Sequence, residues 1–425
     1  MAEGGIGARI GRSIEGGPLS HAPYRRIIAV KTLFKFAAYM QMIASAWLVF
    51  KLSGRAMDVG IVAALALGPS LVGAPLGGSL ADRYCPRKLS MLFMGLQVPP
   101  LLVLAALGAT GSLTVPLIFV FVFLYAVPYS LGEPILELVV PFTVPPELRH
   151  QAVTDASAAQ NTAEFAGAVV GGAAVQLVGA TAVYGFNALA CAAVVVVIAL
   201  SPILQRACDL AKAHHDASLR AGMREGWPIP VVKTVIYGGT LFFLLIAPIE
   251  QLMATIANDH GEGAALLGVL LSAIAVGATI GNRVLNRLNM RGRSSNELLV
   301  WGALIAAPPT ILLGFSSSIF TDYLLLIVIG FAWELLEVSG QSAMQLEVPN
   351  HISGRMVGVF YLLVTGASAL GALIAGWLFD ELGVDTSLVG LGAVALACAG
   401  LLYLRGRGAG AVTRPVSTGE RGAGR

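Results

Sequence analysis

Six glutamates lie inside long apolar stretches of this 425-residue chain. A charged side chain at the centre of a membrane helix costs about 2.5 to 3.5 kcal/mol, so each acid needs a partner, a water-filled cavity or a proton. Glu133 and Glu137 are four residues apart, and Glu334 and Glu337 are three apart, so each pair lies on one helix face. Carboxylates so placed can take up protons on one side of a membrane and release them on the other. We therefore predict that these four acids couple protons to a transport step.

A second interpretation stays open for several of these acids. Glu137 is near the end of its apolar stretch, where it can pair with Arg83, Arg87 or Arg149. Glu164 or Glu250 can instead bond a neighbouring helix. Deeper positions favour cavity or coupling roles for Glu133, Glu334 and Glu337.

Apolar runs bounded by glycine, proline and charged residues predict the helices that hold the acids. One crossing takes about 20 apolar residues. We predict an all-α membrane protein with twelve transmembrane helices at residues 28–50, 57–81, 88–109, 114–141, 154–179, 182–202, 231–257, 264–286, 296–316, 321–346, 355–379 and 386–404.

The composition supports this fold class. The chain is 56% hydrophobic and 12% charged, with a mean hydropathy of +0.78. Soluble domains carry roughly 25% charged residues, so an ordinary soluble enzyme is excluded. The net charge is only +3 and the chain has little polar surface, so the sequence does not indicate the clustered basic surface that binds nucleic acid.

The polar stretches divide the chain into five parts. We expect a cytoplasmic tail at 1–27, a six-helix bundle at 28–202, a cytoplasmic linker at 203–230, a second six-helix bundle at 231–404 and a basic disordered tail at 405–425. The basic tail is expected to contact anionic membrane lipids.

The distribution of cations predicts the orientation. Of the 27 Lys and Arg residues, all but Lys51 and Arg55 fall on the side of the termini or at span ends facing it. Because cytoplasmic loops are rich in Lys and Arg, both termini are expected in the cytoplasm, with the chain crossing the inner membrane many times.

The two predicted bundles resemble each other in sequence. A shift of 204 residues aligns spans two and four with spans eight and ten, and pairs arginine, glutamate, proline and glycine positions without a gap. A pseudo-symmetric duplication, common in transporters, is therefore expected. The matched pairs are Gly73 with Gly277, Gly77 with Gly281, Arg83 with Arg287, Glu133 with Glu337 and Pro145 with Pro349.

A tight cytoplasmic turn joins spans two and three and holds Gly78, Asp82, Arg83, Arg87 and Lys88. Glycines let helices touch, and an acid at the membrane edge can pair with cations or with a helix N-terminus in one conformation only. This pattern resembles the G-x-x-x-D-R-x-x-x-R-K signature of the major facilitator superfamily, although Pro86 departs from it. The resemblance implies a gating motif, while Arg87 and Lys88 taken alone could be ordinary positive-inside anchors.

The second half carries a degraded copy of this motif that ends at Arg287, with Asn286 at the position of the acid. In the superfamily this gating motif is commonly stronger in one half, and the pattern here is similar.

A narrower resemblance is to the drug-proton antiporter group that includes enterobactin exporters and macrolide efflux proteins. Its markers in span one are Gln41, Trp47 and Ser53-Gly54, within residues 36–54. Glu133 and Glu137 stand where that group more often has other polar or basic residues.

Spans one, five, seven and ten usually line the cavity in the superfamily, which implies candidates for substrate contact. Aromatic side chains, including Tyr361 of span eleven, suit a bulky, partly apolar ligand, although each alone could simply face lipid or pack between helices. The candidates are Tyr39, Gln41, Gln160, Asn161, Glu164, Glu250, Gln251, Trp333, Gln341 and Tyr361.

The sequence contains no pattern for ATP, metal or covalent catalysis. There is no GxxxxGK[ST] loop, no HExxH and no GxSxG, and the four cysteines have no metal-type spacing. We expect no enzyme activity, no cofactor and no metal.

These features together predict a secondary transporter that works by alternating access. The resemblance implies export of a small amphipathic compound, such as a drug, siderophore or secondary metabolite, in exchange for protons. We expect the protein to be a monomer. A lipid or lysolipid mover, an uptake carrier and a non-transporting sensor of the same fold are the alternatives.

Overall fold

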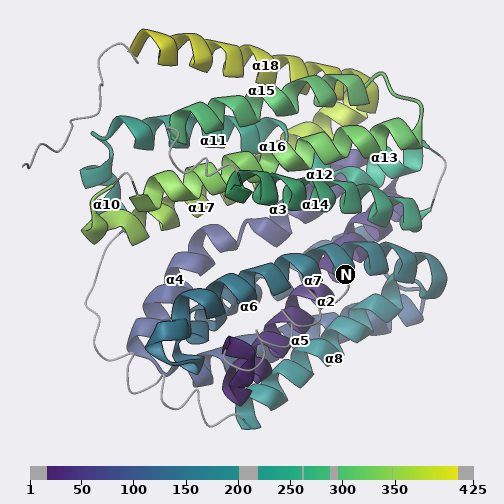
Figure 1. Cartoon of the computed structure of the whole chain (residues 1–425). Helices are drawn as coiled ribbons and strands as arrows, with labels where there is room; N and C mark the ends of the chain where they lie inside the picture. The colour runs from purple at the N-terminus through teal and green to yellow at the C-terminus, as the bar shows by residue number, and fades with distance from the viewer. Residues whose placement is uncertain (1–16, 201–218, 261–262, 288–294, 347, 410–425) are drawn as a thin grey trace, which may run out of the picture.

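The computed structural model describes residues 17–200, 219–260, 263–287, 295–346 and 348–409, and these form helices and turns with no strand among them (Figure 1). Ten segments of this described part are long and apolar enough to cross a membrane. The apolar part of α15 is shorter, and α7 is not among the ten because it carries many polar residues. The all-helical membrane fold is confirmed, whereas the count of twelve crossings stays a prediction.

Helices from the first half of the chain pack together, and we call them the first bundle. Short 3-10 turns at Pro18–Ser20, Val140–Thr143 and Pro146–Leu148 flank them. The helices are α2 (Ala22–Ser53), α3 (Ala56–Leu67), α4 (Ser70–Arg83), α5 (Pro86–Ala109), α6 (Val115–Val139), α7 (Arg149–Val178) and α8 (Ala180–Leu200).

The second bundle is built from the rest of the chain and lies above the first in Figure 1. Its helices are α10 (Leu219–Gly226), α11 (Pro230–Leu245), α12 (Pro248–Gln251), α13 (Met253–Asp259), α14 (Ala264–Arg287), α15 (Ser295–Leu313), α16 (Ile319–Leu346), α17 (Asn350–Leu382) and α18 (Val384–Ala409).

Glycine and proline set several helix ends. Gly54 ends α2 with a φ of 67°, a left-handed conformation that glycine adopts without a steric cost. Gly179 and Gly383 have φ values of 85° and 82° and separate α7 from α8 and α17 from α18. Pro86 begins α5, where its missing N–H is not needed.

Two predicted spans are interrupted. The predicted span 57–81 is divided into α3 and α4 near Pro69, and 231–257 is divided into α11, α12 and α13 around Pro248. Proline removes a backbone donor and clashes with the preceding turn, so a break at each position has a local cause.

Helix α2 begins six residues before the predicted span 28–50. Its first turn is held by Tyr24, which is fully buried and donates a hydrogen bond to the Ala152 carbonyl at 2.9 Å. The first turn of α2 is therefore part of the packed bundle, because it is anchored to the start of α7.

The two bundles contact each other chiefly through α3 with α17 and α7 with α14. These contacts lie at the end of the molecule that holds Gly54, Gly179 and Asp380, which we call the Asp380 end. The opposite end, where α5 begins, we call the Arg87 end. Backbones approach closely at the Asp380 end: a Cβ on Gly376 would lie 2.8 Å from the Ala56 carbonyl oxygen.

Parts of the predicted tails and linker lie outside the described residues, namely 1–16, 203–218 and 410–425. The rest of the predicted linker contains α10, which packs on α17. Gly226 makes this contact, since a Cβ there would meet the Met356 sulfur at 2.7 Å.

Candidate functional site

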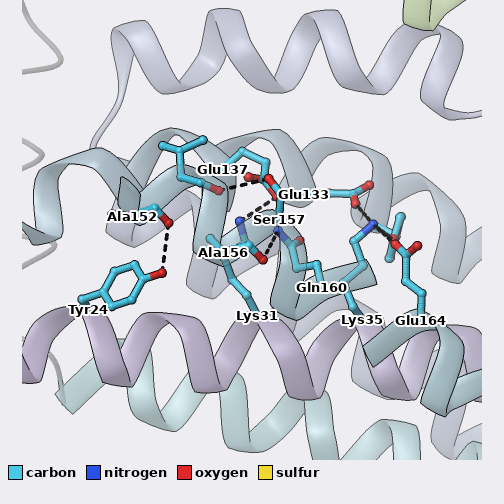
Figure 2. A network of polar contacts seen from close by, with 12 residues as sticks. Tyr24, Lys31, Lys35, Glu133, Glu137, Ala152, Ala156, Ser157, Gln160 and Glu164 are labelled. Carbon is cyan, nitrogen blue, oxygen red and sulfur yellow. Dashed lines mark hydrogen bonds and ion pairs between the residues drawn. The ribbon is translucent and has the colours of Figure 1, made fainter. Parts of the chain in front are cut away.

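Lys35 on α2 lies between two carboxylates from different helices (Figure 2). Its Nζ forms an ion pair with Glu133 of α6 and another, at 3.3 Å, with Glu164 of α7. The same Nζ donates to the Tyr129 hydroxyl at 3.4 Å. The Lys35 side chain is 16% exposed, against 30% and 26% for the two acids, so the group borders an accessible space.

A second charged group repeats this arrangement one helical turn away. Lys31 Nζ lies 2.6 Å from Glu137 Oε1, with the Lys31 side chain 3% exposed. Gln160, with its amide nitrogen toward the acid, donates to Glu137 at 3.0 Å and accepts from Lys31 at 3.2 Å. Lys31 is therefore a buried cation with a close counter-ion and a further hydrogen-bond partner.

The helix period explains why two such groups form. Lys31 and Lys35 are four residues apart on α2, as are Glu133 with Glu137 on α6 and Gln160 with Glu164 on α7. Side chains four apart share a helix face. The three faces meet, and Lys31–Glu137–Gln160 and Lys35–Glu133–Glu164 form what we call the two-rung cluster (Figure 2).

The predicted acids of the second bundle have neutral partners. Glu334 Oε1 accepts a hydrogen bond from Asn282 Nδ2 at 2.7 Å, and Glu337 Oε2 accepts one from Trp333 Nε1 at 3.0 Å. Among described residues, no ion pair to either acid is found. These acids are therefore oriented by neutral donors, whereas those of the first bundle are paired with lysines.

The acids of the two bundles face one another. Glu250 interacts electrostatically with Glu164 of the first bundle and with Glu337 of the second. Glu337 also interacts with Lys35 across the bundles. Glu250 and Glu337 of the second bundle therefore lie within electrostatic range of the Lys35 group of the first.

Aromatic side chains border this group of acids. Trp333 packs edge-on against Phe242 and Phe243, with ring centroids 6.0 and 5.3 Å away. Tyr39 interacts electrostatically with Glu164 and Glu250. Tyr361 is 40% exposed and interacts with Glu334 and Glu337. A ligand between the bundles would meet rings as well as charges.

The remaining cavity candidates do not all join the cluster. Gln41 is buried and accepts a hydrogen bond from Asn187 of α8, so it lies in the packing of the first bundle. Asn161 is exposed on α7, and Gln251 and Gln341 are half-buried.

The predicted gating motif is described only in part. Arg87 donates from Nε to the Ile198 carbonyl at 3.3 Å and from Nη2 to the Ala199 carbonyl, which ties the start of α5 to the end of α8. Lys88 is exposed. The surroundings of Gly78 and the side chains of Asp82, Arg83 and Arg287 lie outside the described part of the structure.

Sequence reasoning missed Lys31 and Lys35 as site residues, because it assigned both to the cationic edge of the membrane. Glu137 forms an ion pair with Lys31, a partner that neither interpretation of this acid named. The four-residue spacing of the lysines, equal to that of Glu133 and Glu137, was the available signal.

Comparison with known proteins identifies relatives of the whole chain. A family model described as transmembrane secretion effector matches residues 15–409. The multidrug efflux pump Tap of Mycolicibacterium fortuitum is 25% identical over 366 residues, covering 82% of this chain and 87% of that protein. Tap of Mycobacterium tuberculosis (strain ATCC 25618 / H37Rv) is 26% identical over 395 residues, covering 86% and 89%.

Solved structures of transporters share the fold. The nucleoside transporter NupG aligns with a TM-score of 0.71 at 12% identity, covering 90% of this chain and 98% of that chain. The D-xylose-proton symporter aligns with a TM-score of 0.70 at 14% identity, covering 89% and 97%. At these identities the likeness concerns the fold alone.

Proposed function

Because the chain belongs to the transmembrane secretion effector family of the major facilitator superfamily, and is therefore a membrane transporter, we propose that it exports small amphipathic organic compounds in exchange for protons. Relatives named as multidrug efflux pumps support the direction and the class of compound. The Arg87 end would face the cytoplasm, with both termini on that side, and the two bundles would expose the central acids to each side in turn.

One observation carries the proton coupling. Lys35 is shared by Glu133 and Glu164, and two acids of the second bundle, Glu250 and Glu337, lie within electrostatic range of Glu164. A single lysine cannot neutralise two carboxylates, so one negative charge is left for a proton. Movement of the bundles changes the distance of Glu250 and Glu337 from this group, and with it the affinity for that proton.

The aromatic border suits the proposed substrate. Rings of Trp333, Tyr39 and Tyr361 offer apolar faces beside carboxylates, the mixture that an amphipathic molecule requires. We propose that the compound binds between the bundles, in contact with these rings.

The test is flux of amphipathic dyes into or out of proteoliposomes under an imposed pH gradient. We expect gradient-driven flux in the wild type, and its loss in Glu133→Gln and in Glu337→Gln, with the amount of folded protein unchanged. Exchange of dye without a gradient should persist in both variants, because it needs no net proton movement.

Glu147→Gln is the matched control, since Glu147 is exposed in the turn before α7. It should transport like the wild type. Unchanged gradient-driven flux in both Glu133→Gln and Glu337→Gln would remove these acids from the mechanism. Absence of flux for every dye, with lipid movement or nutrient uptake instead, would refute export.

A further inference from the structure

Helix α3 of the first bundle has its N-terminus capped by a side chain of the second bundle. Asp380 of α17 accepts hydrogen bonds from the Ala56 and Met57 backbone N–H groups, at 2.7 and 3.0 Å. The residue before α3, Arg55, gives it no side-chain cap, and its Nε lies 3.7 Å from the Asp380 carboxylate. Unsatisfied N–H groups and the helix dipole favour an anion at this position.

Helix α14 of the second bundle has its N-terminus capped by a side chain of the first bundle. Gln176 of α7 accepts a hydrogen bond from the Ala264 backbone N–H at 3.0 Å. Gly263 packs against the Gln176 amide, and a Cβ there would lie 2.7 Å from the amide carbon. Each bundle therefore supplies the cap for one helix of the other.

The two caps occupy equivalent positions in the duplicated chain. A shift of 204 residues carries Gln176 to Asp380 and the left-handed Gly179 to Gly383. A shift of 208 residues carries Ala56, the capped residue of α3, to Ala264, the capped residue of α14. The N-termini of α3 and α14 are thus offset by four residues from the 204-residue register that pairs Gly73 with Gly277, and the capping arrangement occurs once in each half.

Close backbone contacts accompany both caps. A Cβ on Gly172 would lie 2.6 Å from the Ala264 carbonyl oxygen, and a Cβ on Gly268 would lie 2.8 Å from the Ala168 carbonyl oxygen. Gly60 packs on the Ala372 carbonyl in the same way. Because these helices touch, the bundles cannot separate at this end while the capping hydrogen bonds remain.

We propose that Asp380 and Gln176 are reciprocal inter-bundle caps that hold the Asp380 end closed, and that their release is the step that opens it. The proposal rests on the alternating access of the proposed function. Opening leaves three backbone N–H groups without these acceptors. The two caps are unequal, because Asp380 carries a charge near the dipole of α3 and near Arg55, whereas Gln176 is neutral. Asp380 therefore contributes more to closure.

The experiment measures the separation of the bundles directly. Spin labels are placed at Ser112 and Ser317, both exposed at this end in the turns after α5 and α15, in full-length protein whose four native cysteines are replaced. Pulsed electron resonance in lipid nanodiscs gives the ratio of long to short distances. Asp380→Ala should raise that ratio about fivefold, the effect of losing a helix cap, and Gln176→Ala should raise it less.

Two further substitutions separate the cap from a general loss of stability. Gln176→Glu adds an anion at the N-terminus of α14 and should lower the ratio. Asp380→Asn keeps one carbonyl acceptor, so its ratio of long to short distances should lie between those of the wild type and Asp380→Ala. Glu381→Ala, at the exposed neighbouring position, is the matched control and should leave the ratio unchanged.

Gly172→Leu distinguishes this proposal from the proposed function. Its side chain cannot fit beside Ala264, so it should force the Asp380 end apart whatever the caps do. Gly172→Leu could separate the bundles while Asp380→Ala, Gln176→Ala and Gln176→Glu leave the ratio unchanged. That result would refute the role of the caps in closure and leave alternating access intact. No separation in any variant would refute alternating access itself.

Discussion

At the residue scale, the two lysines of the two-rung cluster, Lys31 and Lys35, differ in the number of carboxylates with which they pair. Lys31 has one carboxylate partner, Glu137, and the hydrogen bonds of Gln160 complete that group. Lys35 has two carboxylate partners, so a proton on Glu133 or Glu164 removes an excess negative charge without leaving the ammonium alone. Proton exchange is therefore expected at the Lys35 group, whereas the Lys31 group holds α2, α6 and α7 together.

Replacement of Lys35 tests this charge balance. Lys35→Met leaves Glu133 and Glu164 facing each other without their cation, so we expect a loss of about 1 to 3 kcal/mol in stability, below the value for a fully buried pair because the acids are partly exposed. Thermal unfolding in detergent measures the loss. Combining Lys35→Met with Glu133→Gln and Glu164→Gln should recover most of it.

Lys51→Met is the control for removal of one lysine from the same helix, since Lys51 is exposed in the last turn of α2. It should unfold like the wild type. If the triple variant is no more stable than Lys35→Met, the lysine contributes through its packing and not through its charge.

At the element scale, sequence periodicity predicts which residues share a helix face but not which faces meet. The spacing of Glu133 with Glu137 correctly placed both on one side of α6. It could not indicate that α2 and α7 supply the partners, because that depends on how closely these helices approach. Cations near an apolar boundary suggest a membrane edge, and this expectation hid Lys31 and Lys35.

Gly167 sets the approach of α7 to α2. A Cβ on Gly167 would lie 2.5 Å from the Phe36 carbonyl oxygen and 3.1 Å from the Tyr39 Cβ, both on α2. The Lys35–Glu164 ion pair is one turn away, so it depends on this approach. A small residue at a crossing point of membrane helices is needed for packing of this kind.

Gly167→Ala should therefore destabilise the protein and reduce gradient-driven flux at least several-fold, although alanine is the better helix former by about 1 kcal/mol. Gly185→Ala in α8 is the matched control, since a Cβ there would contact nothing within 4 Å. Thermal unfolding should show opposite shifts for the two variants. Equal shifts would mean that helix propensity outweighs the α2–α7 contact.

At the scale of the whole molecule, the duplication is more complete in three dimensions than the sequence comparison suggested. The 204-residue shift was found in spans two, four, eight and ten, and it also relates the ends of α7 and α17 through Gln176, Asp380, Gly179 and Gly383. The partners of the acids do not follow this duplication. The acids of the first bundle pair with lysines, whereas those of the second accept hydrogen bonds from neutral donors. This unequal charge fits the proposed coupling, in which the Lys35 group of the first bundle holds the proton and Glu337 of the second bundle changes the affinity for it.

The orientation of the whole molecule is the remaining prediction. If both termini are cytoplasmic, Ser112 and Ser317 at the Asp380 end face the outside, and Arg224 of α10 faces the cytoplasm. In intact cells, a membrane-impermeant thiol reagent should label Ser112→Cys and Ser317→Cys, and should label Arg224→Cys only after the membrane is permeabilised. All three positions are exposed, so accessibility differs only by side. The reverse pattern would place the Asp380 end in the cytoplasm. Export driven by proton entry would then require the opposite assignment of the two ends.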